Sequence, residues 1–317
     1  MESLPHCTSW GNHSTMMTGI RLQNTQIMRG TVTGNLLGAL IRFMKTDARH
    51  FQILYLSIFL LYGIFALNWT TDIPKFAVII GTCLGAEAAG ILMMGGNWNR
   101  LKSAMISALG LCLLMYANSL WTYALAGALT ISGKYLIRFN GKHLFNPNNF
   151  GILLAIWFTG DAWISPGQWG SDALLVYFFG AAAIIVLLKV GRLDTSLAFL
   201  GTFMGLQFCR SILFLGWPVD HFIHQFSSGS ILLFSFFMIT DPVTTPGKTG
   251  ARIAWAAMVG AISFFLSNWL HVHTAPVYAL FFITPLTVIL DWYFRGNRFH
   301  WIRPGVEKSP GISPKIN

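Results

Sequence analysis

Long apolar runs separated by short polar connections occupy most of this 317-residue chain. Most of the runs extend for roughly 16 to 22 residues, the length that an α-helix needs to cross a hydrocarbon core about 30 Å thick. We therefore predict an all-α polytopic membrane protein with ten transmembrane segments. They lie near residues 51–68, 76–95, 102–117, 119–137, 147–162, 172–190, 195–215, 222–243, 252–270 and 275–293.

The eighth segment is interrupted by polar residues. The apolar stretch from Ser230 to Thr240 would form only about 17 Å of helix, so a full span must also include residues 221–228. We expect a discontinuous helix whose second part begins near Ser228 and Gly229, with N–H groups that can receive an anion or a polar cofactor group. A glycine-serine kink packed against a neighbouring helix is the alternative. At the other end, Asp241-Pro242 should stop the helix, because proline cannot continue the hydrogen-bond ladder.

The fifth segment is also short. Asn146-Pro147 has the pattern of a helix N-cap followed by proline at the first helical position, and Gly160 follows after about 14 residues. The chain thus has one shortened or interrupted segment in each of two halves of five. An odd number of spans per half gives the halves opposite orientations, so we predict a five-plus-five inverted repeat with a site near the midplane.

Composition supports the assignment to a membrane. Hydrophobic residues make up 54% of the chain and charged residues only 10%, and the mean hydropathy is +0.57. A soluble domain has about 25% charged residues, so we expect membrane lipids to surround most of this protein. The net charge of +10 comes from residues scattered between apolar runs rather than clustered on one face, which argues against nucleic-acid binding.

The basic residues predict the orientation, because they gather on cytoplasmic connections. Of the 21 Lys and Arg residues, all except Lys75 and Arg210 fall before the first segment, at every second connection or after the last segment. Both termini are therefore expected in the cytoplasm. We divide the chain into a cytoplasmic N-terminal segment (1–50), a membrane domain (51–294) and a basic cytoplasmic tail (295–317). Residues 35–45 intersperse leucines with basic residues, a pattern that suits an interfacial helix on the inner leaflet or an ordinary packed helix.

Two motifs resemble a known family. The stretches FNPNNFGI (145–152) and SGSILLFSFFMITDPVT (228–244) are similar to paired signatures in two membrane proteins. These are the D subunit of the Rnf electron-transport complex and the B subunit of the sodium-translocating NADH:quinone reductase. The resemblance covers residues 47–295 in segment number and motif order. It implies a bacterial-type inner membrane protein that works with partner redox subunits in ion-coupled electron transfer. The candidate cofactor-binding residues are Asn146, Pro147, Asn148, Ser228, Gly229, Ser230, Thr240 and Asp241.

One departure from the family concerns flavin attachment. The family carries flavin mononucleotide on a threonine of an S-G-A-T-like segment, within a longer insert between the fifth and sixth spans. Here that connection is GDAWISPGQWGSD (160–172), which has no threonine. We expect no covalent FMN, and non-covalent FMN, riboflavin or a quinone instead. In this respect the chain resembles compact relatives found beside enediyne biosynthesis clusters.

Two ionisable residues lie inside apolar segments. Glu87 lies within the second segment, where a carboxylate either serves ion passage or forms a neutral, hydrogen-bonded structural group. Its placement resembles that of a membrane glutamate in the family, and we mark it as an ion-pathway candidate. Arg210 lies in the seventh segment, where we expect a structural ion pair with Asp220 or Glu87.

Other chemistry finds little support in the sequence. Four histidines on the predicted outer side form H-x-x-H and H-x-H pairs, but without a fixed geometry we assign no metal site; they are His221, His224, His271 and His273. The four cysteines form no CxxC motif, and no Walker loop or HExxH motif is present. Two functions therefore remain open. The chain is a membrane electron-transfer subunit, or it uses the same interrupted helices to transport a small solute or ion without a redox role.

The orientation can be tested with reporter fusions. Fusions after Lys102, Lys142, Arg192 and Lys248 should report a cytoplasmic location, because basic residues mark these connections. Fusions near Gln168 and His273 should report the exterior. Two or more reporters on the wrong side would overturn the ten-segment topology.

Overall fold

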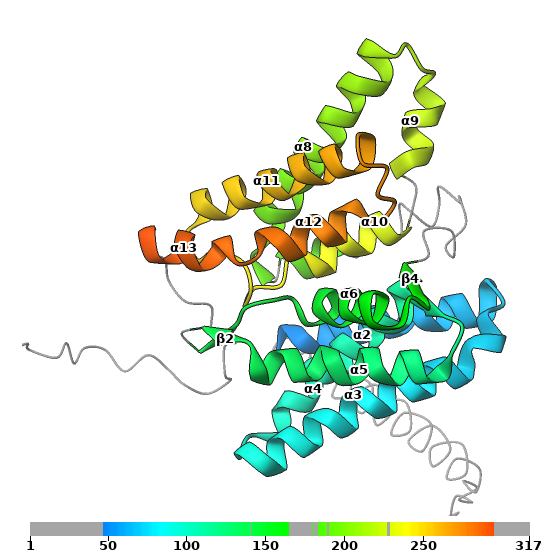
Figure 1. The fold of residues 1–317 in the computed structure, drawn as a ribbon, viewed down its shortest axis with the longest axis vertical. Coiled ribbons are helices and arrows are strands. Elements are labelled where there is room, and N and C mark those ends of the chain that lie inside the picture. Colours follow the sequence, from blue (N-terminus) through cyan, green and yellow to red (C-terminus); the bar gives the residue numbers. More distant parts are fainter. Residues whose placement is uncertain are drawn as a thin grey trace, which may run out of the picture. The chain divides into compact units, whose positions relative to one another are not determined.

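The computed structural model describes residues 47–139, 141–164, 180, 183–188, 190–226 and 229–294 (Figure 1). All but Asp47 belong to one compact unit, Ala48–Trp301. The proposed N-terminal segment and basic tail lie almost wholly outside the described residues, as does most of the sixth apolar run.

Helices form nearly all of the described structure. The first half contains α2 (Ala48–Ala66), α3 (Ile73–Met94), α4 (Leu101–Leu114), α5 (Leu120–Leu136) and α6 (Pro147–Thr159), with short 3₁₀ turns at Trp69–Asp72 and Trp98–Arg100. The second half contains α8 (Leu193–Phe208) with the π-helix η3 (Cys209–Phe214), α9 (Val219–Phe226), α10 (Gly229–Leu233) with the π-helix η4 (Phe234–Met238), α11 (Thr249–Asn268), α12 (Ala275–Ile283) and α13 (Leu286–Tyr293). Two antiparallel ribbons in the connections, β1 (Met115–Ala117) with β4 (Ala162–Ile164) and β2 (Arg138–Phe139) with β3 (Lys142–His143), complete it.

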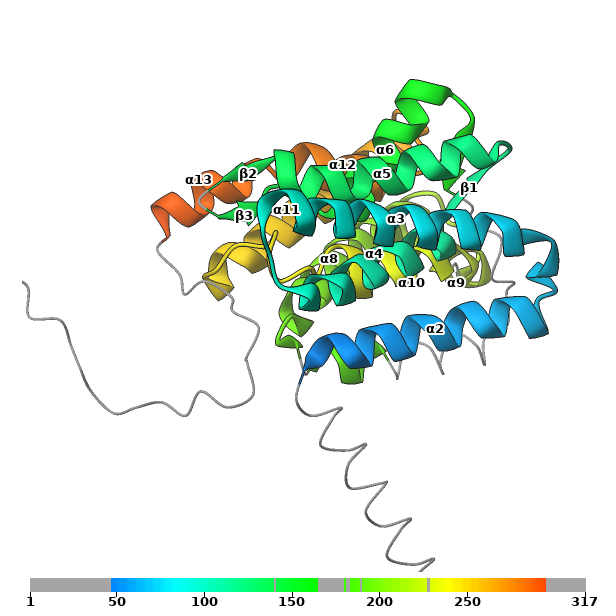
Figure 2. The same ribbon diagram turned by 90° about the horizontal axis from the view of Figure 1, so that it is seen from below.

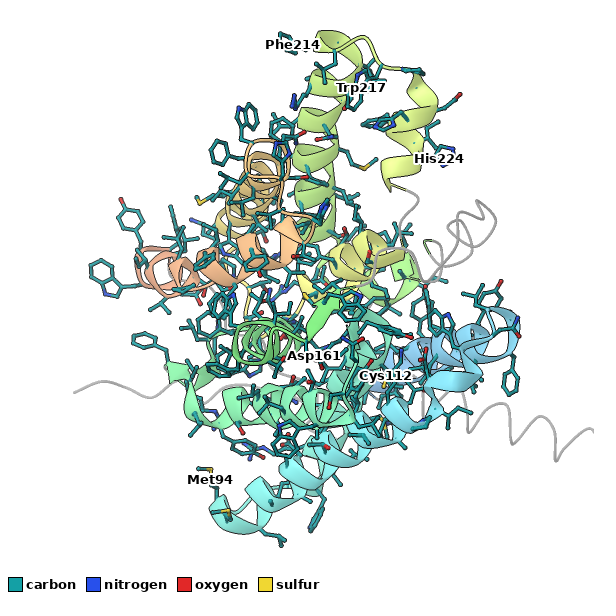
Figure 3. All side chains as sticks on the ribbon, turned by 45° about the vertical axis from the view of Figure 1, so that its right-hand side comes forward. Met94, Cys112, Asp161, Phe214, Trp217 and His224 are labelled. Carbon is teal, nitrogen blue, oxygen red and sulfur yellow. The ribbon has the colours of Figure 1, made fainter. Side chains whose placement is uncertain are left out.

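The described helices confirm a polytopic, all-α membrane protein. Four are long and apolar enough to cross a bilayer, and α12 with α13 forms a fifth candidate that is bent by 47°. Large apolar side chains also point outward in a way that a soluble protein avoids: Met93 is 86% exposed, and Phe214 and Trp292 are each 81% exposed. Figure 3 shows Met94 at the end of α3 and Phe214 at the end of η3. Because part of the sixth run is not described, the count of ten spans stays a prediction.

The two halves repeat the same pattern of helix packing. In the first half α3 packs against α5 and α4, and α5 packs against α6 (Figure 2). In the second half α8 packs against α11 and η4, and α11 packs against α12. Thus the second, third, fourth and fifth segments of each half contact one another in the same order. This repetition is what a five-plus-five repeat requires.

The interruptions also repeat, more fully than the sequence suggested. The third segment, expected as a helix to residue 117, ends at Leu114 because Met115–Ala117 leaves the helix to pair with β4. Its counterpart, the eighth segment, leaves α-helical geometry at the π-helix η4, and residues 227–228 between α9 and α10 lie outside the described residues. The fifth segment is the 13-residue helix α6, and its counterpart in the second half bends by 47° between α12 and α13. Each half therefore has two irregular segments rather than one.

Lys75 is one of the two basic residues that depart from the predicted distribution of positive charge, and its contacts explain its position. Its ammonium lies 2.9 Å from the Asp72 carboxylate and 3.7 Å from the centre of the Tyr116 ring. The Tyr116 hydroxyl donates to the other oxygen of Asp72 at 3.1 Å. Lys75 is thus a locally neutralised, 4% exposed structural group.

Close approach between paired helices depends on glycine in both halves. A Cβ added to Gly127 of α5 would lie 3.2 Å from the Cβ of Thr82 on α3. In the second half, a Cβ added to Gly260 of α11 would lie 2.9 Å from the carbonyl oxygen of Phe199 on α8. Small residues at such crossings let membrane helices pack backbone to backbone.

Gly260→Ala should therefore separate α8 from α11. The added methyl meets backbone, which cannot rotate away, so we expect the free energy of unfolding to fall by roughly 1–3 kcal/mol. Gly205→Ala on α8 is the matched control, since no heavy atom lies within 4 Å of its added Cβ; it should be neutral or slightly stabilising. Thermal unfolding in detergent measures both. Equal stability of the two variants would contradict this account of the crossing.

Candidate functional site

The two sequence motifs meet at one cavity. Its volume is about 150 Å³, and its wall comes from α2, α4, the β3–α6 corner and the turn after η4. Asn146, Pro147 and Asn148 line it from one motif and Asp241 from the other. The structure therefore brings together four of the eight candidate cofactor-binding residues.

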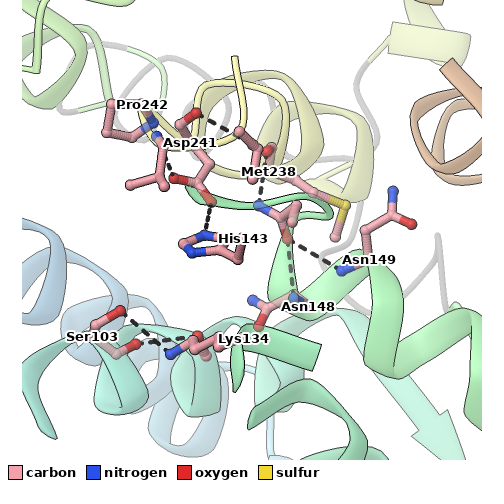
Figure 4. A network of polar contacts seen from close by, with 12 residues as sticks. Ser103, Lys134, His143, Asn148, Asn149, Met238, Asp241 and Pro242 are labelled. Carbon is pink, nitrogen blue, oxygen red and sulfur yellow. Dashed lines mark hydrogen bonds and ion pairs between the residues drawn. The ribbon is translucent and has the colours of Figure 1, made fainter. Parts of the chain in front are cut away.

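Asn146 joins the two motifs directly. Its side-chain oxygen accepts from the backbone N–H groups of Asn148 (3.0 Å) and Asn149 (3.2 Å), which confirms the predicted N-cap of α6. Its amide nitrogen donates to the carbonyl oxygen of Met238 at 2.9 Å, at the end of η4 (Figure 4). The buried Asn146 side chain thus caps the N-terminus of α6 and donates a hydrogen bond to a carbonyl group at the end of η4.

Asn148 presents an unused polar atom. It lies on the first turn of α6 and lines the cavity, and its Oδ1 is buried without a hydrogen-bond partner in the described part of the chain. A Cβ added to Gly110 on α4 would collide with the Asn148 amide. Glycine at position 110 therefore makes room for this side chain. A buried amide oxygen without a partner is costly unless a ligand or water donates to it.

Asp241, in the turn that follows η4, forms the charged part of the wall. Its Oδ1 accepts from the Val243 N–H at 3.1 Å, and its Oδ2 lies 3.4 Å from Nε2 of His143 on β3. One oxygen of Asp241 thus has a backbone N–H donor and the other faces an imidazole ring. His143 was not predicted, and its place three residues before the N-cap is the one signal that could have suggested it.

Three of the remaining candidates, Gly229, Ser230 and Thr240, do not line the cavity. Thr240 is buried, and its hydroxyl donates to the Phe236 carbonyl oxygen at 2.6 Å, which closes the last turn of the helix. Gly229 and Ser230 form the first turn of α10, and within that helix the cavity is lined by Leu233. Ser228 lies outside the described residues.

Glu87 lies beside the cavity but does not line it. It is 3% exposed on α3, nearer to Met94 than to Ile73, and its Oε1 accepts from the Tyr135 hydroxyl at 2.7 Å. The Lys134 ammonium lies 3.7 Å from Oε2. Lys134 counted as a marker of the cytoplasmic connection in the sequence, yet it lies in the last turn of α5 and is only 7% exposed. Helix spacing alone could not have paired residues on α3 and α5.

The expected partners of Arg210 were wrong. Its Nε donates to the Asn268 side-chain oxygen at 2.9 Å, and its guanidinium lies over the Trp269 ring. The π-helix η3 turns Arg210 towards the end of α11 rather than towards Asp220 or Glu87. Among the described residues no three histidine, cysteine, aspartate or glutamate side chains come together as a metal site. Of the four histidines that the sequence places on the outer side, His221 packs edge-on against Trp217, a residue labelled in Figure 3.

The sequence matches the family model described as the NQR2, RnfD, RnfE family over residues 14–300. The chain belongs to this family. Among similar curated proteins is the D subunit of the ion-translocating oxidoreductase complex of Stutzerimonas stutzeri, 23% identical over 304 residues, covering 73% of this chain and 85% of the relative. The protein of the same name from Shewanella frigidimarina is 30% identical over 144 residues, covering 44% of this chain and 38% of the relative. The family resemblance inferred from the two motifs is thereby confirmed.

The double role of Asn146 can be tested by two substitutions. Asn146→Ala removes both the cap, which contributes about 0.5–2 kcal/mol, and the donor to Met238, whose loss leaves a buried carbonyl group unsatisfied at about 1–3 kcal/mol. Asn146→Ser keeps a capping oxygen and loses only the donor. We expect the unfolding temperature to fall in the order wild type, Asn146→Ser, Asn146→Ala. Identical unfolding temperatures for all three would show that neither contact stabilises the fold.

Proposed function

We propose that this chain is the membrane-embedded subunit of an Rnf- or NQR-like electron-transfer system coupled to ion movement. We further propose that the cavity holds a quinone headgroup or one edge of the ring system of a non-covalent flavin (FMN or riboflavin). The observation that carries this is the meeting of both family motifs, through Asn146, Asn148 and Asp241, at one cavity wall.

The residues present fit a redox ring. Leu56, Ile106 and Phe237 supply apolar wall, while Asn148 offers an unused amide oxygen to an N–H or O–H group of the ring. The carboxylate of Asp241 and the ring of His143 provide a charged edge. A bound flavin or quinone would supply the chemistry of electron transfer, and these residues would hold and orient it.

The size of the cavity limits what fits. A cavity of about 150 Å³ holds a single benzene-sized ring, whereas sites for larger ligands occupy roughly 300–1,000 Å³. A quinone headgroup or one edge of a flavin fits the observed space. A complete tricyclic flavin would require α2 or the turn after η4 to move outward.

The proposal also covers the membrane, the orientation, the partners and the flavin attachment of the chain. We place the chain in a bacterial-type inner membrane with both termini in the cytoplasm, since the basic residues mark every second connection. The relatives are named as subunits of a complex, which supports partner redox subunits for this chain. The connection at 160–172 has no threonine, so we propose that any flavin is held without a covalent bond.

The visible spectrum of the purified protein, followed by acid and solvent extraction, tests the cofactor. We expect flavin or quinone to be released by extraction. Gly110→Leu should abolish binding, because the new side chain fills the cavity beside Asn148. Gly229→Leu should abolish it only if the break before α10 forms the site, so the two variants distinguish the two placements. Asp241→Asn should weaken binding through loss of the charge.

Three outcomes would count against parts of the proposal. Flavin that remains with the polypeptide after denaturation would show covalent attachment. Undiminished binding in Gly110→Leu would remove the cavity as the site. A wild-type protein without flavin or quinone would favour the alternative of a transporter without a redox role.

A further inference from the structure

The buried pair Glu87–Lys134 argues against a metal-cation pathway at Glu87. Both side chains are almost fully enclosed. A carboxylate in such a place requires a counter-charge, and the Lys134 ammonium, 3.7 Å from Oε2, supplies it from within the chain. The position that a cation would take beside Oε2 is thus occupied by a cation of the protein.

The surroundings of Glu87 are poor in metal ligands. Hard metal cations are held by several oxygen atoms at once. Oε1 of Glu87 accepts from the Tyr135 hydroxyl at 2.7 Å, and among the described residues Glu87 belongs to no group of three histidine, cysteine, aspartate or glutamate side chains that could hold a metal ion. A sodium ion at Oε2 would also be repelled by the ammonium.

The same surroundings suit a proton. Oε2 is buried and has no hydrogen-bond partner among the described residues, so its lone pairs are open to a proton. At 3.7 Å the ammonium is paired with this oxygen but not hydrogen-bonded to it. A movement of less than about 1 Å would bring the two atoms to the distance of a charge-assisted hydrogen bond.

Lys134 also connects Glu87 to the cavity. Its ammonium donates to the Ser103 hydroxyl at 3.3 Å, and Ser103 lines the cavity together with Ser107, His143 and Asp241 (Figure 4). A continuous series of polar groups therefore leads from Glu87 on α3, through Lys134 on α5 and Ser103 on α4, to the cavity wall.

From this arrangement we propose that Glu87 handles protons and not sodium, and that Lys134 passes protons between the cavity and Glu87. In the step, an N–H bond of the Lys134 ammonium breaks and an O–H bond forms at Oε2. The amine then takes a proton from a hydronium ion in cavity water beside Ser103, which leaves a water molecule. The pair gains one proton and one positive charge. This inference deepens the proposed ion coupling and rests on it.

Several charged or titratable groups face the pair. Cys83 lies on α3 and Tyr135 on α5, and Asp241 acts on Lys134 from the turn after η4. The guanidinium groups of Arg100 and Arg138 lie 5.5 and 5.8 Å from the centre of the Tyr135 ring. An effect of pH is therefore attributed to the pair only if a substitution of Glu87 or Lys134 abolishes it.

Sodium dependence is the first test, on the purified full-length chain in lipid nanodiscs. The thermal unfolding temperature of wild type should be the same in sodium chloride and in choline chloride at equal ionic strength. Glu87→Gln should show the same absence of a sodium effect. A sodium-specific stabilisation of wild type that disappears in Glu87→Gln would overturn the proposal.

Infrared spectroscopy is the second test. Lys134→Met removes the counter-charge, so Glu87 should take up a proton and show a carboxylic acid C=O band that is absent from wild type at neutral pH. The band should be lost in the double variant Lys134→Met/Glu87→Gln, and Lys134→Arg should resemble wild type. Absence of the band in Lys134→Met would contradict the proposal.

Two controls keep the result interpretable. If Lys134→Met fails to fold, the sodium comparison in wild type and Glu87→Gln still decides the proposal. Flavin and quinone are extracted from the same samples. Their absence would contradict the proposed cavity ligand and leave the infrared and sodium results unaffected.

Discussion

Charges buried in apolar surroundings must find their partners inside the protein, and this constraint organises the membrane unit. An unpaired ion in such a place costs several kcal/mol, whereas a paired one is tolerated. The described part of the chain meets the constraint by joining separate elements rather than neighbours in one loop. The pairs between separate elements include the buried Glu87–Lys134, the largely buried Asp194–Arg252 and His143–Asp241, and the partly exposed Lys142–Asp291, while Asp72–Lys75 is a local pair.

Backbone groups at the helix interruptions follow the same constraint. Irregular backbone at membrane depth is stable only where protein or an internal cavity satisfies its polar groups. Asn146 caps α6 and donates to the Met238 carbonyl, and Arg192 donates to the Pro242 carbonyl at 3.3 Å. The Gly247 N–H donates to Asp291 at 2.8 Å. The turn after η4 is therefore held by side chains from both halves of the repeat, which places Asp241 firmly in the cavity wall.

Two of the buried side-chain atoms that lack a hydrogen-bond partner in the described structure lie at the proposed sites. The Asn148 oxygen at the cavity and the Glu87 oxygen next to Lys134 are buried and lack hydrogen-bond partners in the described structure. Unsatisfied polar atoms are expensive, so a native fold retains them where a ligand, water or proton binds. One of these atoms faces the proposed ring site and the other the proposed proton site, and Ser103 connects them.

The sequence alone determined the class of the protein, most segment positions, the cap at Asn146 and the family, because apolar run length and short motifs act locally. It also indicated that segments are interrupted, because a short apolar run forms a helix that is too short to cross the membrane. The tertiary structure decided which motifs meet, which segments match across the halves, and that Lys134 and not Arg210 neutralises Glu87. Those outcomes depend on contacts between residues far apart in the chain, and helix packing at positions such as Gly110 and Gly260 sets them.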